Sequence, residues 1–172
     1  MSSYKFDNIK PFRSLDEGMY LVLLHANSVP PHLGLINSKR YYSLSVKGQA
    51  IGEDATALIK LINRKSIKTL FVRLQDEKVD LEFLKKIFSA KEQVTKEITC
   101  LYPIRIVLSE LYEMKIAKAQ YIYEVLPYLF FNDQIVEVTH KNMDDNICND
   151  TFQFEKYTME TIQARVKSYE SK

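Results

Sequence analysis

The sequence predicts an α+β fold in which helices pack against a mainly antiparallel sheet. Short apolar runs separated by turn residues fill the first third of the chain, which also holds all four glycines. Apolar residues at helical spacing dominate the remainder. The 172 residues suit a single domain, 1–172, because a chain of this length buries roughly two-thirds of its unfolded surface. We expect a polar N-terminal extension over 1–12 and a weak C-terminal helix over 158–169.

Strand patterns occur in five segments. Residues 19–25 form an apolar run after a turn, which is typical of a buried strand. Residues 33–36 and 41–46 flank four polar residues that favour a turn, so this pair predicts a hairpin. Residues 69–74 and 135–139 are short and rich in β-forming side chains. Together these segments supply the expected sheet.

Helix signals follow the hairpin. Asp54 and Asp80 are each placed to cap a helix, the first of which runs to about Arg64. A third helix starts near Cys100 and carries its apolar residues on one stripe. A fourth is expected over 117–131, where Pro127 should kink it or end it early. These helices provide the second layer of the fold.

Composition narrows the classes of function. Lys and Arg number 24 against 22 Asp and Glu, and this balance argues against a nucleic-acid partner, which usually requires a basic excess on one face. The chain has no apolar stretch near the length of a membrane span and no apolar leader segment at its start. Two cysteines do not make a disulfide scaffold. We therefore expect a cytoplasmic protein without a membrane span.

Cys100 is the candidate nucleophile. At the start of a helix, unpaired backbone N–H groups and the helix dipole favour negative charge. A thiol there ionises more readily, and the thiolate is the reactive form. The same N–H groups can stabilise the oxyanion that forms when a carbonyl is attacked. The alternative is a structural cysteine, because free cysteines commonly pack as small apolar residues.

His32 is the candidate general base. It follows two prolines, which restrict the backbone, and it opens the first hairpin strand. A turn centred on 38–39 places Gly34 opposite Ser43 and His32 opposite Ser45, and opposed residues project to the same face. This face resembles the floor of a site, in which Ser45, or alternatively Ser43, orients the imidazole. The other face is apolar and is expected to face the core: Leu33, Leu35, Tyr42, Leu44 and Val46. The alternative for His32 is a surface histidine on a solvated sheet face.

Other candidate residues carry weaker signals. His25 and His32 could form a metal pair, but no carboxylate stands at metal-ligand spacing, so we expect neither metal nor cofactor. Asp144 and Asp145 lie in a polar loop that is more typical of a solvated turn than of a cation site. Cys148 has acidic neighbours, which oppose ionisation of its thiol and make it the poorer nucleophile.

The segment 31–36, which reads Pro-His-Leu-Gly-Leu-Ile, resembles the His-small-Gly-Ile/Leu-Tyr strand of the circularly permuted, NlpC-like branch of papain-fold proteins. That branch includes lecithin:retinol acyltransferase-like enzymes and bacterial hydrolases. In its chain order, a histidine strand comes first, a polar residue on the next strand orients the histidine, and a nucleophilic cysteine opens a later helix. His32, then Ser43 or Ser45, then Cys100 follow this order, and the resemblance covers about residues 18–111.

Two departures from the pattern stand out. Cys100 is followed by Leu, Tyr and Pro, whereas many members have Ser, Glu and Leu after the cysteine. A serine stands where relatives orient the histidine with His, Asn or an acid. These departures bear on activity more than on fold.

The resemblance implies a permuted papain-like cysteine hydrolase or acyltransferase that acts on an amide or ester. His32 would serve as general base, Ser45 or Ser43 would orient it, and Cys100 would attack the carbonyl. The substrate class stays open among small molecules, lipids and peptides. The rival interpretation is a non-catalytic α+β domain that binds a ligand or a protein through its aromatic-rich helices.

Overall fold

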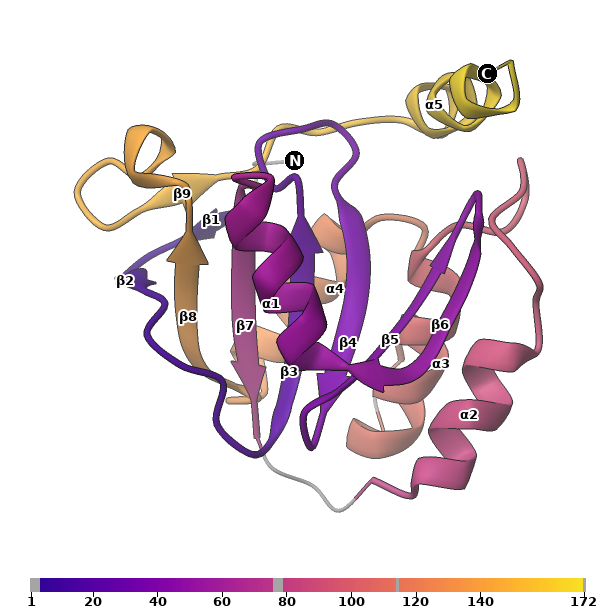
Figure 1. Ribbon diagram of the computed structural model, residues 1–172, viewed down its shortest axis with the longest axis horizontal. Helices are drawn as coiled ribbons and strands as arrows, with labels where there is room; N and C mark the ends of the chain where they lie inside the picture. Colours follow the sequence, from indigo (N-terminus) through magenta and orange to yellow (C-terminus); the bar gives the residue numbers. More distant parts are fainter. Residues whose placement is uncertain (1–3, 76–78, 114, 172) are drawn as a thin grey trace.

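The computed structural model describes residues 4–75, 79–113 and 115–171 (Figure 1). In these ranges the chain forms a mainly antiparallel sheet of seven strands, a separate sheet of two strands, and five helices. The expected α+β class is therefore confirmed.

The large sheet has the strand order β2-β8-β7-β3-β4-β5-β6. Its strands are β2 (Lys10–Pro11), β3 (Met19–Leu24), β4 (His32–Asn37), β5 (Arg40–Ser45), β6 (Gly48–Asp54), β7 (Thr69–Leu74) and β8 (Ile135–Lys141). Neighbouring strands are antiparallel except β2 and β8, which are parallel. The small sheet pairs β1 (Lys5–Phe6) with β9 (Phe152–Gln153).

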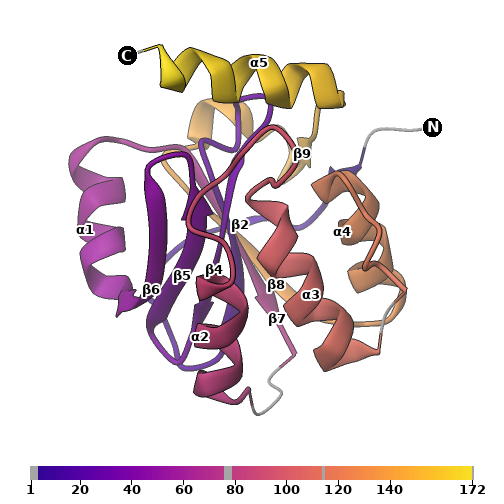
Figure 2. The same cartoon turned by 90° about the vertical axis from the view of Figure 1, so that its right-hand side faces the viewer.

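Both faces of the large sheet are apolar and both are covered. Helix α1 (Ala55–Arg64) covers one face, and α2 (Leu81–Ser89), α3 (Leu101–Tyr112) and α4 (Ile122–Phe131) cover the other (Figure 2). In β3, Leu21 and Leu23 pack on the side of the three helices, whereas Val22 packs on the side of α1. This double burial explains why residues 19–24 form a continuous apolar run rather than an alternating one.

The β4–β5 hairpin adopts the expected register, with Gly34 opposite Ser43. The paired residues extend from there to the turn and stop short of His32 and Ser45. His32 instead pairs with Leu24 of β3. The expected core face is confirmed, since its residues belong to the cluster packed under α2, α3 and α4: Leu33, Leu35, Tyr42, Leu44 and, partly buried, Val46.

Two helices begin at the expected caps. The side chain of Asp54 accepts a hydrogen bond from the backbone N–H of Thr56 at 2.9 Å, and Asp80 accepts one from Glu82 at 3.0 Å. Helix α4 starts later than expected and continues through Pro127 to the expected end at Phe131, so of the two effects expected of Pro127 the early end does not occur. Its buried apolar side chains hold the helix against the sheet despite the hydrogen bond that proline removes. These side chains are Ile122, Val125, Leu126 and Leu129.

The two ends of the described chain contribute to the packing. Phe6 and Ile9, within the segment expected to be a polar extension, are buried in the core. Helix α5 (Met159–Glu170) begins at a Thr158 cap and lies across one end of the sheet (Figure 2). It buries Ile162 and Val166, so the weak C-terminal helix is present and packs against the body of the protein.

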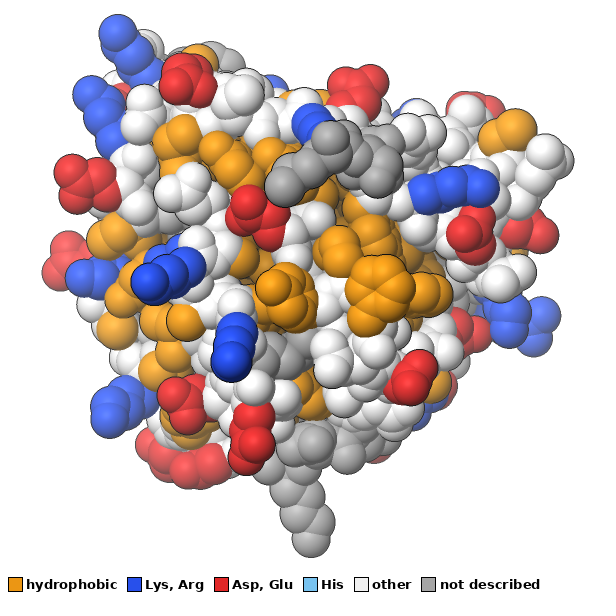
Figure 3. All heavy atoms as spheres, turned by 180° about the vertical axis from the view of Figure 1, so that it is seen from behind, with side chains coloured by type: hydrophobic (Ala, Val, Ile, Leu, Met, Phe, Trp, Pro, Cys, Tyr) orange, Lys and Arg blue, Asp and Glu red, His pale blue; other side chains and the backbone are white. Residues whose placement is uncertain are grey.

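The rear face of the molecule is rich in apolar side chains (Figure 3). Helix α4 exposes three aromatic residues: Tyr128, Phe130 and Phe131. A cavity of about 530 Å³ lies beside them and is lined in part by Tyr4, Phe6 and Pro127. Among its described lining residues there is no cysteine or histidine, so this cavity offers no nucleophile.

Candidate functional site

A cavity of about 570 Å³ lies under α5, where β3 ends, β4 begins and β5 ends. His32, Ser45 and Cys100 all line it, so three residues far apart in sequence are brought to one cavity. Its wall also takes Leu61 from the α1 side and Leu101 from the α3 side. The cavity therefore lies at the end of the sheet and is lined by residues from both sides of it.

Cys100 occupies the N-cap position of α3, with backbone angles of −61° and −20°. Its side chain is half-buried. The loop that leads to it is fixed to the sheet, because the backbone N–H of Val94 donates to the carbonyl of Ser45 at 2.9 Å. Pro103, the third residue of the helix, fits there because N–H groups in the first turn have no helical acceptor. The expected helix start at Cys100 is thus confirmed.

The ionisation of Cys100 differs from the sequence expectation. Burial raises the pKa of its thiol to about 11, although backbone N–H groups of Leu33, Cys100 and Leu101 act in the opposite direction. The N–H groups at the helix terminus stabilise the thiolate, as expected. Burial in apolar surroundings destabilises the thiolate by more, so the pKa rises. The expected activated thiol is therefore a neutral thiol in this structure.

His32 also favours its neutral form. Burial lowers the pKa of its imidazole from the usual 6.5 to about 4, and the nearby His25 adds to the shift. Among the described residues, no hydrogen-bond partner holds the ring of His32, and neither Cys100 nor a serine bonds to it. An uncharged imidazole is a proton acceptor, which is the state a general base requires.

Neither serine holds the imidazole. Ser45 donates to the carbonyl of Gly48 at 3.1 Å and accepts from the N–H of Lys47 at 3.2 Å, so its hydroxyl serves the β5–β6 turn. Ser43 is buried and bonds to the hydroxyl of Tyr41 instead. It is also absent from the described lining of the cavity. The orienting role proposed for either serine stays a prediction without a contact to support it.

The cavity wall is apolar and carries only positive formal charges among its described residues. The basic side chains are Lys47, Lys65 and Arg165. Apolar lining residues come from the sheet, α1, the loop before α3, and α5: Leu24, Pro30, Pro31, Leu33, Val46, Leu61, Ile67, Val94, Leu101, Ile162 and Val166. Such a wall suits a ligand with an apolar body and a polar or anionic group.

Tyr157 and Arg165 are among the cavity residues that the sequence did not point to. Tyr157 and Arg165 lie beyond the segment in which the site was sought, close to or within a helix that looked weak. The available signal was the Thr158 cap directly after an aromatic residue. His25 also lines the cavity, in a left-handed conformation at the end of β3.

In the described part of the chain, no three His, Cys, Asp or Glu residues come together as metal ligands. Asp144 and Asp145 lie in a short 3-10 turn, and Cys148 is exposed. None of the described helices has the length and apolar content needed to cross a membrane. Comparison of the chain with protein-family models, curated proteins and solved structures gave no match.

Proposed function

We propose that the protein is a cysteine hydrolase or acyltransferase that acts on an amide or ester through Cys100 and His32. The observation that carries the proposal is the common cavity: a thiol at a helix N-terminus and a neutral, unpaired imidazole line the same apolar space. The permuted papain-like chain order, with the histidine strand before the cysteine helix, agrees with this assignment.

The two pKa directions favour general-base catalysis rather than a resting ion pair. His32 would accept the thiol proton as the sulfur attacks the carbonyl, and would return it to the leaving group. The backbone N–H groups of Cys100 and Leu101 would receive the developing oxyanion. A water molecule or an acceptor alcohol or amine would then release the acyl group from the sulfur.

A chromogenic ester tests the proposal. Incubation with p-nitrophenyl butyrate should release nitrophenol and leave a butyryl group on Cys100, located by mass spectrometry of the digested protein. The Cys100→Ser and His32→Gln variants should lose both signals, whereas Cys148→Ser, the matched control at an exposed thiol, should keep them. Hydrolysis that persists in Cys100→Ser would contradict the assignment.

A second function is a non-catalytic domain that binds an apolar ligand. The apolar wall of the cavity and its basic side chains favour this alternative, and an uncharged Cys100 and His32 do not oppose the binding of an apolar ligand. Here an apolar anionic dye, anilinonaphthalene sulfonate, should bind equally to the wild type and to Cys100→Ala. Val46→Trp should abolish binding by filling the cavity, and no ester should be turned over.

A further inference from the structure

Tyr157 lies in the segment between β9 and α5 and lines the cavity together with Cys100. Its side chain is buried, with 6% of its surface exposed. The ring packs edge-on against Tyr121 and Tyr123, at centroid distances of 5.6 and 5.3 Å. This packing restrains the ring, so the position of its hydroxyl is fixed by the fold.

The hydrogen bonds of Tyr157 leave its phenolic proton available. The backbone N–H of Ile122, the first residue of α4, donates to the Tyr157 oxygen at 3.5 Å. Among the described residues, no acceptor takes the proton of this hydroxyl. A buried O–H normally finds a partner, and an accepted hydrogen bond polarises the group and makes it a better donor. The arrangement therefore calls for an acceptor inside the cavity.

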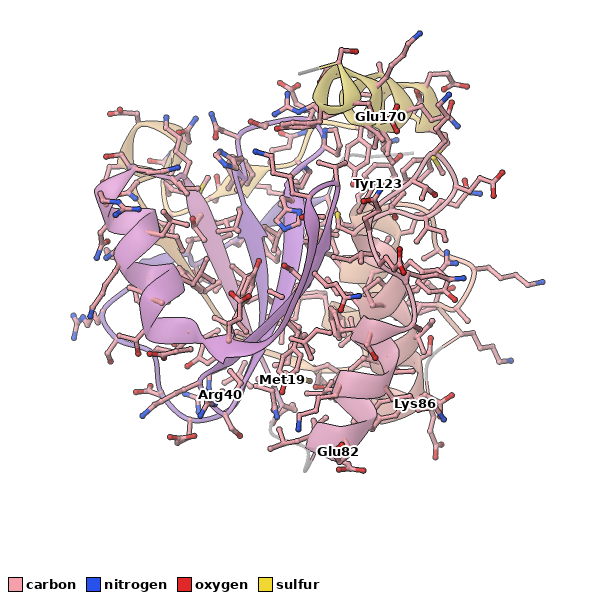
Figure 4. All side chains as sticks on the ribbon, turned by 45° about the vertical axis from the view of Figure 1, so that its right-hand side comes forward. Met19, Arg40, Glu82, Lys86, Tyr123 and Glu170 are labelled. Atoms are coloured by element: carbon pink, nitrogen blue, oxygen red, sulfur yellow. The ribbon has the colours of Figure 1, made fainter. Side chains whose placement is uncertain are left out.

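The backbone beside Tyr157 is held by a second contact. The hydroxyl of Tyr123 donates to the Tyr157 carbonyl at 2.6 Å. Tyr123, labelled in Figure 4, lies on the helical side of the sheet beneath α5. Restraint at both the carbonyl and the ring is what a preorganised donor requires, since a donor fixed in advance needs no reorganisation during reaction.

The electrostatic surroundings favour negative charge at this point. The N-terminal ends of α3 and α4 both meet here, through Cys100 and Ile122. Lys47 and Arg165 lie on the cavity wall, and the described lining contains no carboxylate. Burial raises the pKa of the Tyr157 phenol, and negative charge on the nearby Cys100 raises it further, so the phenol stays protonated and able to donate.

We infer that Tyr157 is a catalytic residue, the side-chain donor of the oxyanion hole for acyl transfer to Cys100; this inference rests on the proposed function. In the step concerned, a sulfur electron pair forms the C–S bond as the thiol proton passes to His32. The carbonyl π pair moves to oxygen, which accepts hydrogen bonds from the Tyr157 hydroxyl and the backbone N–H of Leu101. Collapse restores the carbonyl and expels the leaving group, which takes the proton from His32.

The test compares two reactions of the same sulfur. Acylation by p-nitrophenyl butyrate forms an oxyanion, whereas alkylation by iodoacetamide is a displacement that forms none. Tyr157→Phe should slow acylation of Cys100 about 100-fold, the usual cost of one oxyanion donor, and should change alkylation less than threefold. Tyr42→Phe, which removes another buried phenol outside the described cavity wall, should change neither rate.

A second variant covers the case in which Tyr157→Phe does not fold. Tyr123→Phe frees the Tyr157 carbonyl and should slow acylation by a smaller factor, with alkylation preserved. An unchanged ratio of acylation to alkylation in the folded variants would overturn the assignment of Tyr157. Failure of the proposed function has a different signature, because the wild type itself would then form no acyl-Cys100.

Discussion

The ring of Tyr41 lies directly over the backbone of Gly34. A Cβ atom built on Gly34 would lie 2.7 Å from the Tyr41 hydroxyl oxygen and 2.9 Å from its Cζ atom. Both residues are buried on the hairpin face that carries His32. The space left by the glycine is thus filled by a neighbouring aromatic ring, which also covers Ser43 through their hydrogen bond.

Gly34→Ala should destabilise the protein by about 1–3 kcal/mol, because the added methyl overpacks the hairpin. Urea denaturation measures this change. Combining it with Tyr41→Ala removes the clashing ring, so the double variant should be less destabilised than the sum of the two single variants. Additive effects would show that the ring and the glycine are not coupled.

The stability of the protein should fall in mild acid because of His32. Its folded-state pKa, about 4, is below its usual 6.5, so between these values the unfolded chain binds more protons. Stability is therefore complete above pH 6.5 and is lost as the pH falls toward 4. The loss between pH 7.5 and 5 should be about 2 kcal/mol from this group.

His32→Gln should remove most of this pH dependence of the free energy of unfolding, as measured by urea denaturation at pH 7.5 and pH 5. His25→Gln, which changes an exposed imidazole, should retain most of it, because burial is the larger cause of the lowered pKa of His32 and His25 the smaller. Identical pH profiles in the wild type and in His32→Gln would contradict the assignment of the acid sensitivity to His32.

The exposed Cys148 should be alkylated before Cys100 in the native protein at pH 7. Burial raises the pKa of Cys100 to about 11, so very little of it is thiolate, and α5 limits access to it. Iodoacetamide labelling followed by peptide mapping gives both rates. In denaturant the two cysteines should be alkylated at similar rates. If Cys100 were alkylated faster than Cys148 in the native protein, its thiol would be activated by the helix terminus, and this prediction would be wrong.

Loosening α5 should expose Cys100 without unfolding the sheet. The helix is attached through buried Ile162 and Val166 and through the amide of Gln163, which donates to the Lys96 carbonyl at 3.5 Å. Replacing both apolar residues by alanine should raise the alkylation rate of Cys100 at least tenfold by weakening local packing. Lys167→Ala, on the exposed side, is the matched control.

In that comparison, the rate at Cys148 serves as an internal reference and should not change. Far-UV circular dichroism reports whether the sheet persists in the double variant. Equal acceleration at both thiols would indicate global unfolding and would contradict a role for α5 as a cover.

Elements with local signals could be predicted from the sequence. Asp54 and Asp80 start helices because their carboxylates satisfy free N–H groups within two residues, and such contacts are visible in a short window. The hairpin register follows from a four-residue turn for the same reason. Of the strands that were missed, β1, β9 and β2 depend on partners distant in sequence, as in the pairing of β1 with β9 and of β2 with β8. Strand β6 was also missed, although it pairs with the neighbouring β5.

The candidate site was only partly predictable. Chain order placed His32 and Cys100 together, but it gave no information about burial, which reverses the expected ionisation of the thiol. The face of the hairpin that carries His32 was expected to form an open floor. Ile36 and Tyr41 occupy that face nearer the turn and pack with α1, so much of it is a second core. Helix α5 had a local signal, but its contacts with the cavity, and those of Tyr157, depend on residues that are distant in sequence.

The order in which the sheet is connected implies an order of assembly in time. Strands β3, β4 and β5 each pair with the next strand in the chain, so these pairings close short loops and lose little chain entropy. Helix α5 follows these strands in the chain and covers one side of the cavity. During synthesis, the β4–β5 hairpin with His32 would therefore form before α3 with Cys100. Until α5 is added, the cavity would be open on one side. Any chemistry that needs an enclosed cavity would therefore begin only when α5 docks.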